Sequence, residues 1–267
     1  MPYTTTWTAI ADVAPFPALS TLEVSGGYAF DDDLLFRGNS KTLRRLCIPF
    51  CAIARNALGR FKILKRGDVM CMDSICIGDA TDADNVFIAE QSVLIKQQMD
   101  DILETTRSLT LGDKTNDNLL MNAIYAAPSS AVLQSVRLTY LVFDLCHTIK
   151  VVAALPSLVS FTCVVHDASS NIGSISENER PSGLRAAHYP LSQNFRVLRM
   201  TYMAESATKV AIVAIKVAAM CPNLVRVDMP PKLRPEFSRE IAWATYNDSF
   251  EPYTDSLRHL VYRDLNS

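Results

Sequence analysis

The chain has 267 residues, of which 49% are apolar and 20% are charged, and its formal net charge is −2. These values exclude the strong charge bias of chains that bind nucleic acid or anionic membranes non-specifically. The longest uncharged apolar stretch, Val151 to Val165, contains Pro156 and is too short to span a bilayer. We therefore expect a soluble globular protein.

The seven cysteines are odd in number and include no C-x-x-C pair. Cys47, Cys76 and Cys163 lie in apolar, strand-like segments, whereas Cys146 and Cys221 lie near expected helix ends. This distribution is typical of buried, reduced thiols rather than of a disulfide framework. Because the N-terminal stretch MPYTTTWTAIADVAPF also lacks the features of a secretory signal, we expect a cytoplasmic or nuclear protein.

One six-residue motif, Leu-x-x-Φ-x-Φ with Φ apolar, recurs along the chain and predicts its strands. We call it the strand motif and number its residues 1 to 6. Clear copies begin at Leu19, Leu43, Leu133, Phe195, Leu224 and Leu257, and weaker copies begin at Met72, Thr106 and Leu158. Successive copies start 24 to 37 residues apart. The sequence therefore predicts about nine short strands.

Helical patterns fill the intervals between these strands. Apolar residues recur at helical spacing in Asn85 to Leu103, Asn118 to Ala126, Leu141 to Val152 and Ala207 to Ala218. In Asp31 to Asn39 the aspartates suit a helix N-cap and the glycine a C-cap. Helix and parallel strand are therefore expected to alternate.

Proline and loop residues mark the boundaries of these elements. Proline stands two residues before the strand motif at Pro17, Pro156 and Pro222, where it ends one element and opens the next. Residues 167–190 are rich in Ser, Asn, Gly and Pro and have no helical period. We expect this segment to be a long loop insertion, either passive or carrying partner contacts.

Together these features resemble leucine-rich repeat proteins of the long-repeat kind, such as ribonuclease inhibitor and the F-box/leucine-rich repeat receptors. Cys221 to Leu224 is similar to the C-P-x-L junction of cysteine-containing repeats, and Phe16 to Asn39 resembles a segment of F-box-like families in fungi. The resemblance covers roughly residues 16–265, although the asparagine that follows the strand in many families is missing. It implies one α/β leucine-rich repeat horseshoe over residues 1–267, with a concave parallel sheet of about nine strands and convex helices.

The chain departs from this family pattern at both ends. The flank of residues 1–15 is too short for an F-box, and the last strand motif, Leu257 to Tyr262, has no helix after it to cap the array. The resemblance therefore implies that the adaptor-binding module is missing from this chain. A fragment, a trimmed gene model and a paralogue that has lost the module all fit.

Side chains alternate across a strand, so motif positions 3 and 5 should project from the sheet on the face opposite the core. We call these residues the position-3 row and the position-5 row. The position-3 row is Thr21, Arg45, Ser74, Ser108, Ser135, Ser160, Val197, Arg226 and His259. The position-5 row is Glu23, Cys47, Cys76, Thr110, Arg137, Thr162, Arg199, Asp228 and Val261, and Arg263 follows at position 7 of the last copy.

These rows predict a partner-binding face with a basic C-terminal half. Arginine is favoured at interfaces because its planar fork pairs with carboxylates in two places. The predicted contact residues are Arg45, Ser108, Ser135, Arg137, Thr162, Arg199, Arg226, Asp228, His259 and Arg263. The alternative is that these side chains only give an open sheet face its polar cover.

No group of residues predicts a catalytic, cofactor or metal site. Gly112 to Thr115 lacks the earlier glycine of a phosphate loop, and Asp31 to Asp33 lacks the alternating ligands of a cation loop. The histidines are too scattered to chelate. Cys47 and Cys76 should lie about 5 Å apart on neighbouring strands, where a redox or metal role is the alternative to simple packing.

The sequence therefore predicts a protein-interaction scaffold that binds an acidic protein or peptide, with no nucleic acid and no membrane as partner. The family resemblance implies substrate recognition for a cullin-type ubiquitin ligase, whose adaptor would bind only through the missing module. A structural or regulatory scaffold unrelated to ubiquitin is the main alternative. A hydrolase or nucleotide-binding enzyme is a more distant one.

Overall fold

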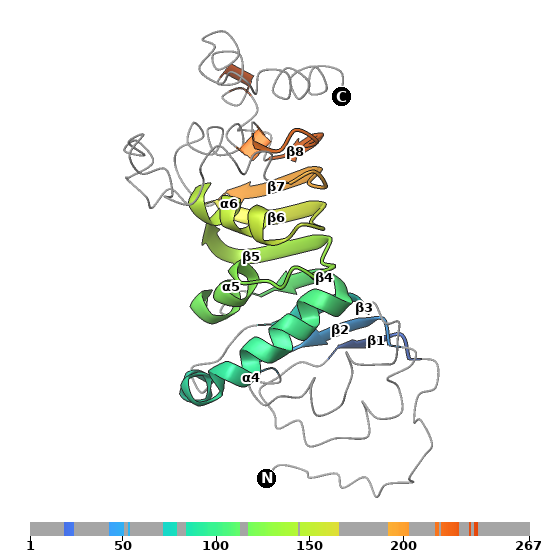
Figure 1. The fold of residues 1–267 in the computed structure, drawn as a ribbon, viewed down its shortest axis with the longest axis vertical. Coiled ribbons are helices and arrows are strands. Elements are labelled where there is room, and N and C mark those ends of the chain that lie inside the picture. The colour runs from blue at the N-terminus through green and yellow to red at the C-terminus, as the bar shows by residue number, and fades with distance from the viewer. Residues whose placement is uncertain are drawn as a thin grey trace, which may run out of the picture.

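Eight parallel strands, in the order of the chain, form one open sheet in the computed structural model (Figure 1). The structure describes residues 19–23, 43–50, 53, 72–78, 84–112, 117–143, 145–165, 192–202, 217–218, 220–229, 235 and 238–239. The strands are β1 (Thr21–Glu23), β2 (Arg45–Ile48), β3 (Met72–Ile77), β4 (Thr106–Leu111), β5 (Ser135–Phe143), β6 (Ser160–Val165), β7 (Val197–Tyr202) and β8 (Arg226–Asp228). They stack along the long axis of the molecule.

Each of these strands coincides with a copy of the strand motif. In β4, for example, Leu109 and Leu111 are fully buried and alternate with the partly exposed Thr110. Every described residue at motif positions 1, 4 and 6 is buried in β2 to β7 and at least partly buried in β1 and β8. The prediction of an α/β protein with one parallel sheet is therefore confirmed over these eight strands.

A hydrogen-bond pattern one residue before the strands sets their common register. The carbonyl of Ser20, at motif position 2, accepts the N–H groups of Arg44 and Arg45 at 2.8 and 2.9 Å. The same two bonds join Arg44 to Asp73 and Ser74, Gln134 to Val159 and Ser160, Val159 to Arg196 and Val197, and Arg196 to Val225 and Arg226. In these five pairs of neighbouring repeats, the same backbone atoms therefore position one repeat on the next.

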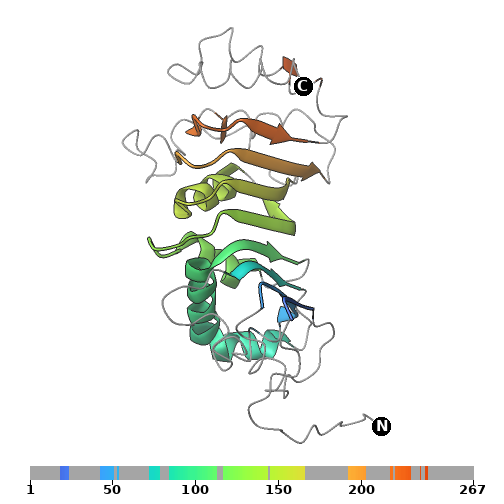
Figure 2. The same ribbon diagram turned by 90° about the vertical axis from the view of Figure 1, so that its right-hand side faces the viewer.

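Three helices, α4 (Asp84–Thr105), α5 (Asp117–Tyr125) and α6 (Leu145–Ala154), lie on one side of the sheet (Figures 1 and 2). Their apolar faces meet the buried faces of the strands in one continuous core. In α4, Ile95, Met99 and Ile102 are fully buried, at spacings of four and three residues that place them on one helical face. Of the helix predicted over 207–218, Val217 and Ala218 are described, and both are helical and buried.

The prediction of a helix starting at Leu141 is wrong at its N-terminal end. Leu141 lies in β5, and α6 begins only at Leu145. Tyr140, Val142 and Phe143 are aromatic or β-branched and favour an extended backbone. The strand thereby continues beside β6 after a shift in register between Arg137 and Val142.

Two asparagines just before β7 and β8 tie neighbouring repeats together. Asn194 donates from Nδ2 to the carbonyl oxygen of Pro156 at 2.9 Å, and Asn223 donates from Nδ2 to the carbonyl oxygen of Gln193 at 2.9 Å. Both asparagines directly precede motif position 1, and both acceptors lie two residues before position 1 of the preceding copy. The amide groups therefore continue the register of the backbone bonds beyond the strand ends.

We expect Asn223→Asp to lower the free energy of unfolding by about 1 kcal/mol, because a carboxylate cannot donate to the Gln193 carbonyl. Asn194→Asp should cost a similar amount, and urea denaturation measures both. Asn122→Asp, at an exposed position on α5, is the control that makes the same change in charge. An equal loss in all three variants would show that charge, rather than the bond between repeats, is responsible.

Several predicted segments lie outside the described residues: the helix signal at Asp31 to Asn39, the loop at 167–190 and the last strand motif at Leu257 to Tyr262. Among the helices that the structure does describe, none is both long enough and apolar enough to cross a membrane.

Candidate functional site

The candidate site is the sheet face that carries the position-3 and position-5 rows, which we call the polar face. Parallel pairing aligns Thr21, Arg45, Ser74, Ser108, Ser135, Ser160, Val197 and Arg226 across β1 to β8. It also aligns Glu23, Cys47, Cys76, Thr110, Arg137, Thr162, Arg199 and Asp228. Both rows therefore run unbroken over eight strands, whereas His259 and Arg263 lie outside the described residues.

None of the described residues in these two rows is buried. In the middle of the position-3 row, Ser74, Ser108, Ser135 and Ser160 are partly exposed and follow one another on β3, β4, β5 and β6. Their side chains are short and carry one hydroxyl each, which can both donate and accept a hydrogen bond. The middle of the position-3 row therefore carries short, uncharged side chains.

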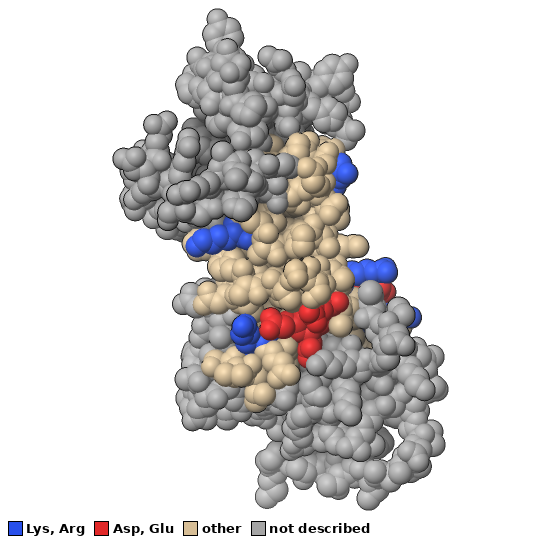
Figure 3. Space-filling view, in the orientation of Figure 1, with Lys and Arg blue, Asp and Glu red and all other residues tan. Residues whose placement is uncertain are grey.

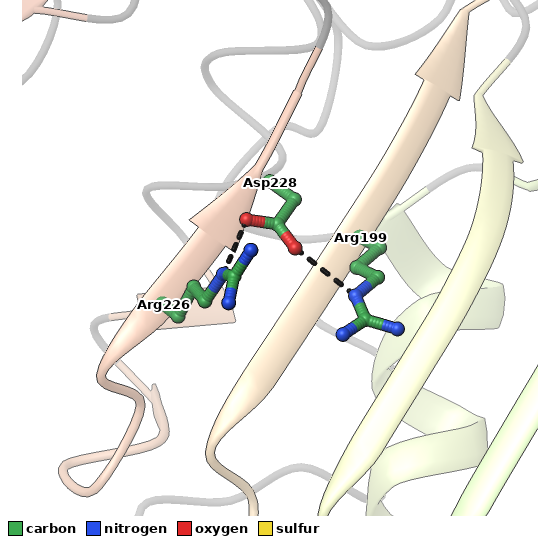
Figure 4. A network of polar contacts seen from close by, with 3 residues as sticks. All are labelled: Arg199, Arg226 and Asp228. Atoms are coloured by element: carbon green, nitrogen blue, oxygen red, sulfur yellow. Dashed lines mark hydrogen bonds and ion pairs between the residues drawn. The ribbon is translucent and has the colours of Figure 1, made fainter.

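Three charged side chains of the polar face form one ion-paired group on its last two strands. Arg199 Nε of β7 donates to Asp228 Oδ2 of β8 at 3.0 Å, and Arg226 Nε donates to Asp228 Oδ1 at 2.6 Å (Figure 4). The arginine side chains are 51% and 63% exposed, and the aspartate is 32% exposed. One carboxylate therefore holds two guanidinium groups, each through its Nε alone.

Asp228, which is also among the predicted contact residues, neutralises part of the charge of Arg199 and Arg226. Exposed ion pairs contribute only about 0–1 kcal/mol to stability, so their main effect is to orient the side chains. Within the described part of the chain, the terminal nitrogens of both arginines make no hydrogen bond. Those nitrogens are the donors that remain for another molecule.

Arg137 adds a third guanidinium group to the same row. It lies on β5, in register with Thr162 of β6, which in turn pairs with Arg199 of β7. Neighbouring strands lie about 4.8 Å apart, so the backbones of Arg137 and Arg199 are separated by roughly 10 Å. Arg137 is exposed, and it pairs with no carboxylate among the described residues.

Comparison with protein-family models, with curated proteins and with solved structures finds no match. Function has to be inferred from the geometry and charge of the polar face. Within the described ranges, no three or more His, Cys, Asp or Glu side chains are placed to hold a metal ion.

Three further arginines border the polar face, and the sequence pattern did not single them out. Arg44, Arg107 and Arg196 all stand at motif position 2, directly before position 3, and all are exposed. Asp73 occupies the same position in the copy that forms β3. The sequence carries arginine at position 2 in four of the nine copies, Arg258 of the last copy included, and this recurrence is the signal for these residues.

The two lysines that the structure describes and the arginines of its strand motifs lie on different sides of the molecule. The lysines among the described residues, Lys96 and Lys150, lie on α4 and α6, where Asp101 and Glu104 of α4 also lie. Acidic side chains gather over this helical side in Figure 3. The described arginines of the strand motifs instead border or occupy the polar face. Because arginine is the better partner for planar anions, the two sides differ in chemistry as well as in shape.

Cys47 and Cys76 lie side by side on β2 and β3, as their positions in the strand motif predict. Both are free thiols and both are partly exposed. Burial raises the pKa of Cys47 to about 12, and its hydrogen bond with Cys76 and the charges of Cys76 and Glu23 contribute further. Cys47 therefore keeps its proton near neutral pH. Burial likewise raises the pKa of Cys163 and of Cys221 to about 12.

Proposed function

We propose that this chain is a leucine-rich repeat scaffold that binds an acidic segment of another protein across its polar face. The observation that carries the proposal is the in-register alignment of the two rows over β1 to β8. A row of that length presents side chains at a regular spacing of about 4.8 Å. Extended faces of this kind suit partners with an extended contact surface.

The acidic character of the partner follows from the arginines. Arg137, Arg199 and Arg226 stand on the polar face, and Arg44, Arg107 and Arg196 border it. A hydrogen bond to a charged group contributes about 1.5–3 kcal/mol where it is shielded from water. Several such bonds are enough to favour an acidic partner over a neutral one.

Asp228 has a positioning role in this proposal. It accepts one bond from the Nε of each arginine and so limits the orientations that the two guanidinium groups adopt. A partner carboxylate can then bind the terminal nitrogens with less loss of side-chain entropy. The free chain thus holds two of its binding groups close to the arrangement that a partner needs.

The test is the double variant Arg137→Glu plus Arg199→Glu, measured against a binding segment recovered by affinity purification with the wild-type chain. We expect affinity to fall by at least about 100-fold, because two attractive contacts become repulsive. The matched control is Lys96→Glu plus Lys150→Glu, which makes the same charge change on the helical side and should bind as the wild type does. Equal affinity of both variants, with unchanged circular dichroism, would refute the polar face as the binding site.

A narrower form of the proposal is substrate recognition for a cullin-type ubiquitin ligase, which rests on the family resemblance of the strand motifs. Its test is separate from that of the polar face. A ligase adaptor should co-purify with the full-length gene product. If only other proteins co-purify, a scaffold unrelated to ubiquitin becomes the better proposal.

A further inference from the structure

We infer that Cys47 and Cys76 form a modification site, in which exchange with a small-molecule disulfide such as glutathione disulfide joins β2 to β3 by a reversible disulfide bond. This site lies at the opposite end of the polar face from Arg199, Arg226 and Asp228. The inference does not depend on the identity of any protein partner.

The backbone places the two thiols within reach of each other. Cys47 and Cys76 are direct partners in the parallel register of β2 and β3, so their Cα atoms are about 4.8 Å apart. Disulfides span Cα separations of about 4.4–6.8 Å. Both side chains occupy motif position 5 and project to the same face.

Exposure distinguishes this pair from the other thiols that the structure places. Cys47 and Cys76 are partly exposed, whereas Cys163 and Cys221 are buried in the core. A dissolved disulfide can therefore reach the first pair. The buried thiols lack this access, and the register partner of Cys163 on β7 is Met200 rather than a cysteine.

The two cysteines have unequal roles in the exchange. Cys47 holds its proton, because burial and the neighbouring Cys76 and Glu23 raise its pKa. We therefore assign the first attack on glutathione disulfide to Cys76. This step forms a bond between Cys76 Sγ and one glutathione sulfur, breaks the glutathione S–S bond and releases one glutathione thiolate, which takes up a proton.

The second step closes the protein disulfide. Once Cys76 carries glutathione, its sulfur is held beside Cys47 by the strand register, so the second attack is intramolecular and proceeds although burial still raises the pKa of Cys47. The Cys47 thiolate then attacks Cys76 Sγ and releases the second glutathione. In sum, two protein thiols are oxidised, and one glutathione disulfide is reduced to two thiols.

The experiment treats the folded wild-type chain with glutathione disulfide, blocks the remaining thiols and maps the tryptic peptides by mass spectrometry. The expected product links the peptides 46–55 and 67–96. Each peptide carries a second cysteine, Cys51 and Cys71 respectively, so fragment ions must place the link at Cys47 and Cys76. Dithiothreitol should restore both thiols.

Single variants test the order of the steps. In Cys47→Ser the mixed disulfide should persist at Cys76, at a level at least about tenfold above the adduct at Cys47 in Cys76→Ser. A wild-type chain that keeps both thiols free, or that stops at a mixed disulfide, would overturn the proposed site. Equal adduct levels in the two variants would overturn the assigned roles. The disulfide itself is tested separately, by the peptide map of the wild-type chain.

Discussion

Phe161→Ala is expected to lower the free energy of unfolding by about 3–5 kcal/mol, the range for removing a buried aromatic side chain. Phe161 stands at motif position 4 of β6 and is fully buried between Val136 of β5 and Leu198 of β7. Its loss leaves a cavity at the middle of the sheet, where strands on both sides limit how far the core can collapse. Urea denaturation followed by circular dichroism measures the change.

The matched control is Thr162→Ala, one residue further along β6. Thr162 is partly exposed on the polar face and has Arg137 and Arg199 as neighbours in register. Its replacement should change stability by no more than about 1 kcal/mol, the usual span of strand preference. If both variants lost similar amounts, the assignment of position 4 to the core and position 5 to the surface would be wrong.

Gln98→Ala is expected to cost about 2–4 kcal/mol, although the residue is polar. The Gln98 side chain is only 2% exposed, and its Nε2 donates to the carbonyl oxygen of Ile53 at 2.7 Å and to that of Leu94 at 3.3 Å. Alanine would leave the Ile53 carbonyl without this donor, which costs about 1–3 kcal/mol, and would add a cavity beside α4. A loss below about 0.5 kcal/mol would contradict the role of Gln98 in joining α4 to the segment at Ile53.

Gln98→Glu tests the same buried position through the pH dependence of stability. A buried carboxylate beside the Ile53 and Leu94 carbonyls favours its protonated form, so its pKa in the folded chain rises above the unfolded value of about 4.3. The folded state then binds the extra proton, and stability relative to the wild type falls as pH rises from the unfolded pKa through the folded pKa. Urea denaturation at pH 5 and pH 8 should show the larger deficit at pH 8. Gln97→Glu, at an exposed neighbouring position, should show a much smaller difference.

The strands could be predicted because one physical requirement produces both the pattern and the fold. Burial of one sheet face demands an apolar residue at every second position, as at Leu109 and Leu111 of β4, so the strand motif carries the register with it. The helix boundary at Leu141 could not be read in the same way. An apolar run such as Leu141 to Phe143 is compatible with a buried strand or a buried helix, and only pairing with β6 decides between them.

The rows of the polar face were also predictable, but the contacts within them were not. The alternation of side chains along a strand predicts that Arg199, Arg226 and Asp228 share a face, but it does not predict which rotamers they adopt. The structure brings all three into one ion-paired group. The bonds made by Asn194 and Asn223 were missed for a related reason, because each depends on the distance between two repeats rather than on any local period.

The order β1 to β8 follows the chain without a crossover, and each strand pairs with its immediate predecessor and successor. Cohesion in such an array is close to a sum of nearest-neighbour terms. A substitution then destabilises mainly the two adjoining repeats. Unfolding can begin at one end of the sheet and proceed one strand at a time, rather than involve the whole sheet at once. An added or deleted repeat would lengthen or shorten the polar face and leave the contacts between the other neighbouring repeats intact. The length of the polar face can therefore change by one strand at a time.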